Sequence, residues 1–243
     1  MIAPLAKLID WYALQVAAML PSIRKCARGD SKLTEAVEFL NGPDFIPAES
    51  KSAELEFTSK IHFTFPSPRQ CEFGENNFVH GRLYRRANDW QKFPTIILLH
   101  GGGDFLGYRY GFPLKVPAIH RAGFNAGTLV APYHFQRRVR RIEAFDHLQV
   151  AEAFGQGVAE IRALTGWLLN QRCPAVALFG FSLGGWLAGL AATRDSRLKA
   201  VILALPGVRR DYRATSGEGV LWTPMRKALK NKKLRAKRWT RRR

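Results

Sequence analysis

Cysteine is scarce in this sequence. The chain of 243 residues has three, Cys26, Cys71 and Cys173, and no two of them form a C-x-x-C pair. An odd number of cysteines without that pair indicates neither a disulfide framework nor a thiolate metal site. The sequence shows no other metal or cofactor motif, so we expect no cofactor. A reducing, cytoplasmic location fits this composition.

Long apolar runs are also missing. The longest one near the N-terminus, residues 11–20, is interrupted by Gln15 and is far shorter than the roughly 18 residues that a membrane span needs. Lys7 and Asp10 stand where the uncharged core of a secretory signal would begin. The sequence therefore predicts neither a transmembrane helix nor a secretory signal.

Acidic residues are missing from the last part of the chain. The formal charge is +19, but residues 225–243 hold eleven Lys and Arg and no acidic residue. Residues 1–224 therefore carry 27 basic and 19 acidic residues, a charge of +8. We expect a moderately basic globular body followed by a strongly basic tail.

Helical periodicity dominates the first fifty residues. Apolar positions recur three and four apart over residues 5–20 and again over residues 33–40, where Asp30 or Ser31 can cap the second helix. We expect an N-terminal helical extension over residues 1–50, an α/β core over residues 51–224 and the basic tail over residues 225–243.

The core begins with alternating apolar residues and continues with unbroken apolar runs. Alternation over residues 55–65 and 78–84 predicts two partly exposed antiparallel strands. Four unbroken runs predict strands that are covered on both faces: residues 96–99, 127–131, 175–179 and 200–205. Helical stretches at residues 114–122 and 145–169 lie between them. This alternation predicts an open, mostly parallel α/β sheet.

A G-F-S-L-G motif at residues 180–184 directly follows one of these strands and precedes a helix of small residues. A sharp turn from strand to helix holds its central residue in a strained conformation and exposes the hydroxyl of Ser182. The N–H of the following residue points into the same space. The flanking strand and helix make this short motif informative.

A second motif, His100-Gly101-Gly102-Gly103, follows the strand at residues 96–99. Consecutive glycines allow backbone N–H groups to approach a developing oxyanion. A phosphate-binding loop would show a Lys-Ser/Thr pair or a G-x-G-x-x-G spacing, and neither is present. The loop is therefore interpreted as an acyl-transfer element.

Together the two motifs resemble those of the α/β-hydrolase superfamily of esterases, lipases and dienelactone hydrolases, over roughly residues 93–207. Residues 131–138 also resemble a branch of poorly characterised abhydrolase-domain proteins. The resemblance implies a small-molecule acyl ester as substrate and Ser182 as nucleophile, with the N–H groups of Leu183 and of Gly102 or Gly103 as oxyanion donors. It further implies that His100 supports the glycine loop rather than acting as a base. We expect His100, Gly101, Phe105 and His134 at the substrate site.

The resemblance also implies a triad that this sequence does not complete, so we expect the chain to hydrolyse esters feebly or not at all. In the superfamily an acid and then a histidine follow the serine, whereas all six histidines here precede Ser182. Asp211 is the only nearby candidate for the acid, although a solvated ion pair with neighbouring arginines explains it more simply. His134 follows a central strand, at the edge where α/β sheets bind ligands.

Two further segments have competing interpretations. The aromatic stretch at residues 104–112 can form a wall or flap over the nucleophile. Arg137, Arg138, Arg140 and Arg141 can attract an anionic substrate, or they can simply be the solvated start of a helix. We favour the solvated start.

After the run at residues 200–205, a complete hydrolase sheet needs further strand-helix units that carry the acid and the base. We expect that the residues that follow do not supply these units. A truncated or frameshifted hydrolase explains both the missing histidine and the basic tail with one event, whereas a genuine basic arm needs two. In that case residues 200–205 form an unprotected edge strand that promotes self-association. The alternatives to a serine esterase are a pseudo-hydrolase that binds without turnover and a non-specific anion binder acting through the tail. We expect no specific recognition of nucleic acid.

Overall fold

The structure, a computed structural model, describes residues 32–48, 51–140, 142 and 145–204. One compact unit, residues 30–142 and 146–208, holds all of these except Phe145. The expected helix at residues 5–20, Asp211 and the basic tail lie outside the described residues.

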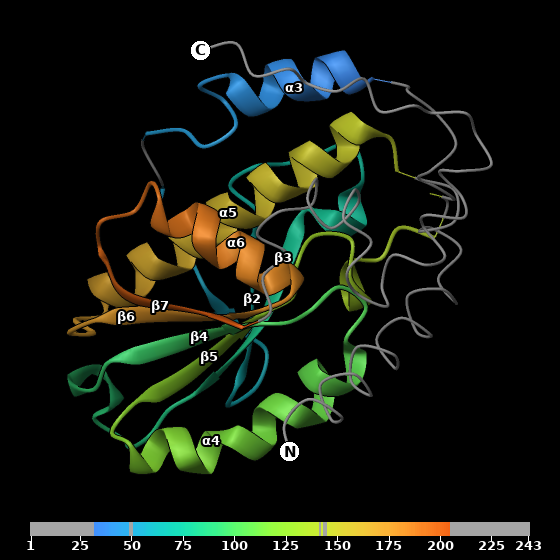
Figure 1. Cartoon of the computed structure of the whole chain (residues 1–243). Helices are drawn as coiled ribbons and strands as arrows, with labels where there is room; N and C mark the ends of the chain where they lie inside the picture. Colours follow the sequence, from blue (N-terminus) through green and yellow to red (C-terminus); the bar gives the residue numbers. More distant parts are fainter. Residues whose placement is uncertain (1–31, 49–50, 141, 143–144, 205–243) are drawn as a thin grey trace, which may run out of the picture. The chain divides into compact units, whose positions relative to one another are not determined.

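The unit is built on a mixed sheet of seven strands in the order β1-β2-β3-β5-β4-β6-β7 (Figure 1). The pairs β1–β2, β2–β3 and β3–β5 are antiparallel, and the pairs β5–β4, β4–β6 and β6–β7 are parallel. This confirms the open α/β sheet, with the expected hairpin at one side. Three of the six strand pairs are parallel, so the sheet is mixed rather than mostly parallel. The strands are β1 (Glu56–Phe57), β2 (His62–Pro66), β3 (Phe78–Tyr84), β4 (Thr95–Leu99), β5 (Asn125–Leu129), β6 (Val176–Phe181) and β7 (Leu198–Ala204).

Helices cover both faces of the sheet. α4 (Phe112–Arg121) lies on one face, and α5 (His147–Asn170) and α6 (Leu183–Ala192) lie on the other, with α3 (Leu33–Asn41) beside α5 (Figure 1). Four short helices complete the described elements: η2 (Gly74–Asn76), η3 (Trp90–Lys92), the π-helix η4 (Gly107–Gly111) and η5 (Phe135–Arg137).

Two helix starts differ from the sequence prediction. The N-cap of α3 is Lys32 in the left-handed conformation, without a side-chain cap, so the proposed caps at Asp30 or Ser31 were wrong. α4 begins at Phe112 rather than residue 114, because η4 leads directly into it. α5, by contrast, begins with a capping box between Asp146 and Gln149.

The core has two parts, one on each face of the sheet. The larger part lies between the sheet and α5 and α6, and the smaller part joins Tyr108 and Phe112 to Leu98 and Val130. Because apolar layers cover both faces of β4 and β5, their sequences show unbroken apolar runs. At the end of the strand order, β7 leaves Ile202 53% and Leu203 44% exposed.

The parallel strands end level with one another. Leu99, the last residue of β4, is in register with Leu129 of β5 and Gly180 of β6. The segments that follow these three strands therefore meet at one edge of the sheet, the carboxyl edge, where open α/β sheets bind ligands.

Two glycines in neighbouring strands differ in the space around them. A Cβ at Gly81 would overlap the ring of Phe63 and the carbonyl of Thr128, whereas a Cβ at Gly127 would meet its nearest neighbour, Ile97, at 3.7 Å. We predict that Gly81→Ala lowers the free energy of unfolding by about 1–3 kcal/mol through overpacking. The matched variant Gly127→Ala changes it by less than about 1 kcal/mol. Urea unfolding measures both, and equal midpoints would contradict the packing argument.

Candidate active site

Ser182 lies at a sharp turn between β6 and α6. Its φ of 50° and ψ of −108° place a non-glycine residue in a strained region of backbone space, at a cost of about 1–3 kcal/mol. Its side chain is exposed, and its N–H donates to the carbonyl of Ala204 at 2.9 Å. The local structure is the strained strand-to-helix turn that the sequence predicted.

The two glycines of the motif allow this turn to form. A Cβ at Gly180 would overlap the carbonyl of Gly184, and a Cβ at Gly184 would overlap the carbonyl of Leu99. The N–H of Gly184 also donates to the carbonyl of His100 at 3.0 Å. The start of α6 is therefore held directly against the end of β4.

The glycine loop after β4 lies beside this turn. Gly102 is exposed, and a Cβ there would be 3.8 Å from Cβ of Leu183. The N–H groups of Gly102 and Gly103 form no hydrogen bond with another described residue, and the N–H of Leu183 belongs to the first turn of α6, which has no partner within the helix. The glycine loop and the first residue of α6 thus lie side by side.

His100 is buried beneath the loop, with 1% of its surface exposed. The N–H of Ala131 donates to its Nε2 at 3.0 Å, so Nδ1 carries the proton and donates to the carbonyl of Gly101 at 2.8 Å. Burial, reinforced by the nearby His134, lowers the pKa of His100 to about 3. The imidazole is a neutral structural link between β5 and the glycine loop, not a proton acceptor.

His134 lies on the loop after β5, against the same glycines. Its Nδ1 donates to the carbonyl of Pro132 at 2.8 Å, which leaves the lone pair on Nε2, and Nε2 would be 3.9 Å from a Cβ at Gly102. Burial lowers the pKa of His134, opposed by the Pro132 carbonyl. His134 is therefore a neutral hydrogen-bond acceptor beside the glycine loop.

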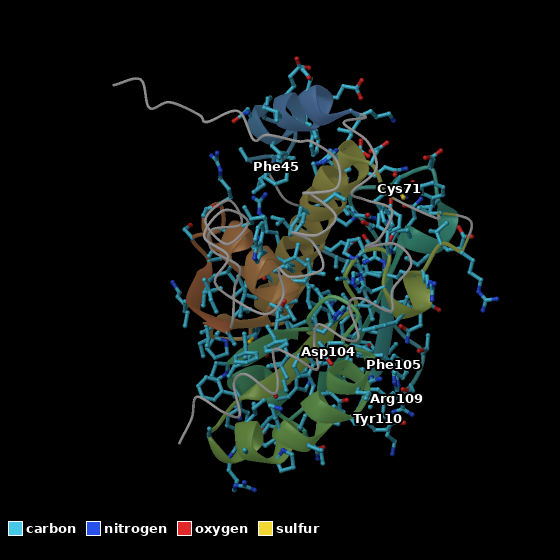
Figure 2. All side chains as sticks on the ribbon, turned by 45° about the vertical axis from the view of Figure 1, so that its right-hand side comes forward. Phe45, Cys71, Asp104, Phe105, Arg109 and Tyr110 are labelled. Atoms are coloured by element: carbon cyan, nitrogen blue, oxygen red, sulfur yellow. The ribbon has the colours of Figure 1, made fainter. Side chains whose placement is uncertain are left out.

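The aromatic segment after the glycines is helical. Phe105 is 48% exposed, and its ring meets Phe135 edge-on at 5.4 Å. Tyr110 is 55% exposed, and the guanidinium of Arg109 lies 5.3 Å from the centre of its ring. Figure 2 labels Phe105, Arg109 and Tyr110 along the segment that leads into α4.

The interpretation of the arginine cluster as a solvated helix start is wrong for Arg137. Its side chain is completely buried and forms an ion pair with Glu160 of α5, so it is neither solvated nor open to an anionic substrate. Arg138 and Arg140 are exposed, and Arg141 lies outside the described residues. Sequence reasoning missed Glu160. Its spacing of four from Gln156 on a helix face shared with apolar residues was the available signal.

The other titratable candidates have structural roles in the described unit. His62 is exposed and contacts Ser59, and Nε2 of His120 contacts the carbonyl of Tyr84. Asp195 is buried and pairs with Arg197 and Arg162. Within the described ranges no group of three or more His, Cys, Asp or Glu could hold a metal ion, and no helix is long and apolar enough to cross a bilayer.

The buried His100 predicts an acid-sensitive fold. Because its pKa is about 3 in the folded chain and near 6.5 when unfolded, its contribution to stability is complete above pH 6.5 and is lost as the pH falls towards 3. We expect His100→Gln to have a lower free energy of unfolding than the parent chain at pH 7. Between pH 7 and pH 4, the free energy of unfolding of the parent chain should fall by up to about 3 kcal/mol more than that of the variant. Urea unfolding across this range measures the slope, with the exposed-site variant His62→Gln as control. Parallel curves for His100→Gln and the parent chain would contradict this assignment.

No protein-family model and no curated protein match the sequence. Among solved structures, the chain is similar to Est1E from Butyrivibrio proteoclasticus, at 15% identity and a TM-score of 0.44 over 69% of this chain and 56% of that one. It is also similar to the α/β serine hydrolase XC6422 from Xanthomonas campestris, at 16% identity and a TM-score of 0.39 over 60% of this chain and 58% of that one. A third similarity is to the esterase Pf2001 from Pyrococcus furiosus, at 14% identity and a TM-score of 0.46 over 74% of this chain and 62% of that one.

The chain thus spans a little over half the length of the first two of these proteins. Similarities this distant assign no activity to it. The chain's own geometry says more about the site than these similarities do. A strained serine turn leads from β6 into α6, and a glycine loop follows the adjacent β4. The described part of the chain therefore has an open α/β sheet with a strained serine turn at its carboxyl edge.

Proposed function

We propose that this protein is a serine hydrolase that cleaves a carboxylic ester, or a related acyl bond, of a small molecule through an acyl-enzyme on Ser182. One observation carries the proposal. An exposed serine in a strained turn stands beside a glycine loop whose N–H groups are free of described hydrogen-bond partners. Backbone strain of this kind persists where the surroundings over-determine it, and it clusters at functional sites.

In the proposed mechanism, Oγ of Ser182 attacks the acyl carbon and its proton passes to a base. Negative charge develops on the carbonyl oxygen, where the N–H of Leu183 and an N–H of Gly102 or Gly103 stabilise it. The C–O bond to the alcohol then breaks, and the alcohol leaves with the proton. Water attacks the acyl-enzyme in the second half of the reaction, which releases the carboxylic acid and regenerates the serine.

The substrate contacts belong to the same edge of the sheet. Phe105, two residues after Gly103, offers an exposed aromatic surface. Nε2 of His134 offers a neutral acceptor beside Gly102. We propose both as substrate contacts. His100 is not the base, because both of its ring nitrogens are already hydrogen-bonded. Within the described part of the chain, Oγ of Ser182 forms no hydrogen bond to any other candidate.

Two assays test this proposal on the full chain. We expect a fluorophosphonate probe to react covalently at Ser182 and a short-chain p-nitrophenyl ester to be hydrolysed. Ser182→Ala should abolish labelling and lower hydrolysis by at least about 100-fold, because it removes the oxygen on which the proposed acyl-enzyme forms. The matched control is Ser59→Ala, at an exposed serine in the turn before β2.

The pattern of results separates a hydrolase from a binding protein. Labelling without turnover would mean that the serine is activated but that deacylation fails. If Ser182→Ala changes neither labelling nor hydrolysis, both come from another group and the proposal is wrong. If the parent chain shows neither, the proposal is also wrong, and the fold serves ligand binding without chemistry. Equal losses in Ser59→Ala would show that the measured activity does not come from this site.

A further inference from the structure

A cluster of buried polar side chains lies behind the candidate site. We call it the polar cluster: Ser67, Asn76, Arg137, Gln156 and Glu160, each at most 3% exposed. These residues come from the segment between β2 and β3, from the loop after β5 and from α5. Buried polar groups are retained only when they are paired, so the contacts within the cluster show what it holds in place.

Arg137 and Glu160 form the centre of the polar cluster. The two guanidinium nitrogens of Arg137 donate to the two carboxylate oxygens of Glu160 at 2.6 and 2.7 Å. The same guanidinium donates to the carbonyls of Val130, at 2.9 Å, and Asn76, at 2.5 and 3.2 Å. Ser67 adds a hydrogen bond to Glu160 at 2.6 Å. The fork geometry therefore joins α5 to two separate backbone segments.

One of these segments is the loop between β5 and η5, which carries His134. Tyr133 and Phe135, on either side of His134, both have positive φ values, 62° and 48°. The N–H of Tyr133 donates to Oδ1 of Asn76 at 2.8 Å. Strain on both sides of one residue persists only where neighbouring contacts impose it, and Asn76 of the polar cluster supplies one such contact at Tyr133.

The loop is in turn connected to the oxyanion loop. Ala131, next to the anchored Val130, donates its N–H to Nε2 of His100, and Nδ1 of His100 donates to Gly101. The ring of Phe135 lies 4.6 Å from the ring of His100, measured between centroids. A continuous series of buried contacts therefore runs from Glu160 to the glycines beside Ser182.

We propose that Arg137 and Glu160 are a positioning pair that holds the loop after β5 and, through His100, sets the conformation of the oxyanion loop. This inference rests on the proposed function for its catalytic consequence. The contacts themselves are independent of it. Well-packed apolar residues commonly replace a buried ion pair without loss of stability, so stability alone does not account for this pair.

The unit contains a second buried ion pair that serves as a control. Arg162 of α5 and Asp195 before β7 are both 4% exposed, and Nε of Arg162 lies 3.8 Å from Oδ2 of Asp195. Arg162 also donates to the carbonyls of Pro47 and Ala48. None of these described contacts reaches the loop after β5 or the glycines.

The test compares two double variants of the full chain, each of which removes both charges of one pair. Arg137→Met with Glu160→Leu removes the positioning pair, and Arg162→Met with Asp195→Leu removes the control pair. For the first we expect kcat for a p-nitrophenyl ester to fall about 100-fold, as when one oxyanion donor is lost, with KM changed less than about threefold. The affinity for a boronic acid that forms a tetrahedral adduct on Ser182 should fall in parallel with kcat. The control variant should retain kcat.

A second measurement does not depend on catalysis. Nitrogen NMR of the imidazole reports whether His100 keeps its proton on Nδ1, and we expect this signature to be lost or averaged in the Arg137/Glu160 variant and kept in the control. If that variant does not fold, Asn76→Ala removes the anchor of Tyr133 while it leaves the ion pair, and it should show the same two effects.

The outcomes separate this inference from the proposed function. If the parent chain neither hydrolyses esters nor reacts with the probe, the proposed function fails, and the NMR signature alone decides whether the pair positions His100. An unchanged His100 signature in a folded Arg137/Glu160 variant overturns the positioning inference. So does an equal loss of kcat in the control variant, because the effect would then follow from general destabilisation.

Discussion

The structure depends on the close approach of three backbone segments at the end of β4. The carbonyl of Leu99 leaves no room for a side chain at Gly184, and the carbonyl of Gly184 leaves none at Gly180. Only with both glycines can α6 begin immediately after β6 and force Ser182 into its strained conformation. The position of the hydroxyl therefore follows from backbone packing, before any side chain of the site contributes.

His100 extends this constraint to the next strand. Its carbonyl accepts the N–H of Gly184, while its ring accepts the N–H of Ala131 and donates to Gly101. One residue thus joins the ends of β4 and β5 to the start of α6. A buried neutral imidazole can do this because its two nitrogens have opposite hydrogen-bonding roles. The desolvation that keeps it neutral also excludes it as a proton acceptor.

Much of the sheet and the serine turn could be predicted from the sequence, because both have local signals. Unbroken apolar runs indicate strands covered on both faces, and β4 and β6 lie within two residues of the predicted runs. β7 also lies within two residues of its predicted run, but it is the edge strand and has no buried residue, so the prediction that both of its faces are covered was wrong. The burial of Arg137 could not be predicted in this way, because its partners Glu160 and Asn76 are distant in sequence and an arginine-rich stretch ordinarily indicates a solvated surface. The tautomer of His100 likewise depends on Ala131, which the fold alone brings near.

The distribution of backbone strain connects these observations. Five described non-glycine residues have positive φ, and two of them, Lys32 and Arg172, simply stand at helix ends. The other three follow β5 or β6 at the carboxyl edge of the sheet: Tyr133, Phe135 and Ser182. Strain costs stability wherever it occurs, and folded proteins keep it where other contacts impose it. Its concentration beside the glycine loop, with a buried ion pair behind it, indicates that this edge is ordered for a geometric task rather than for stability.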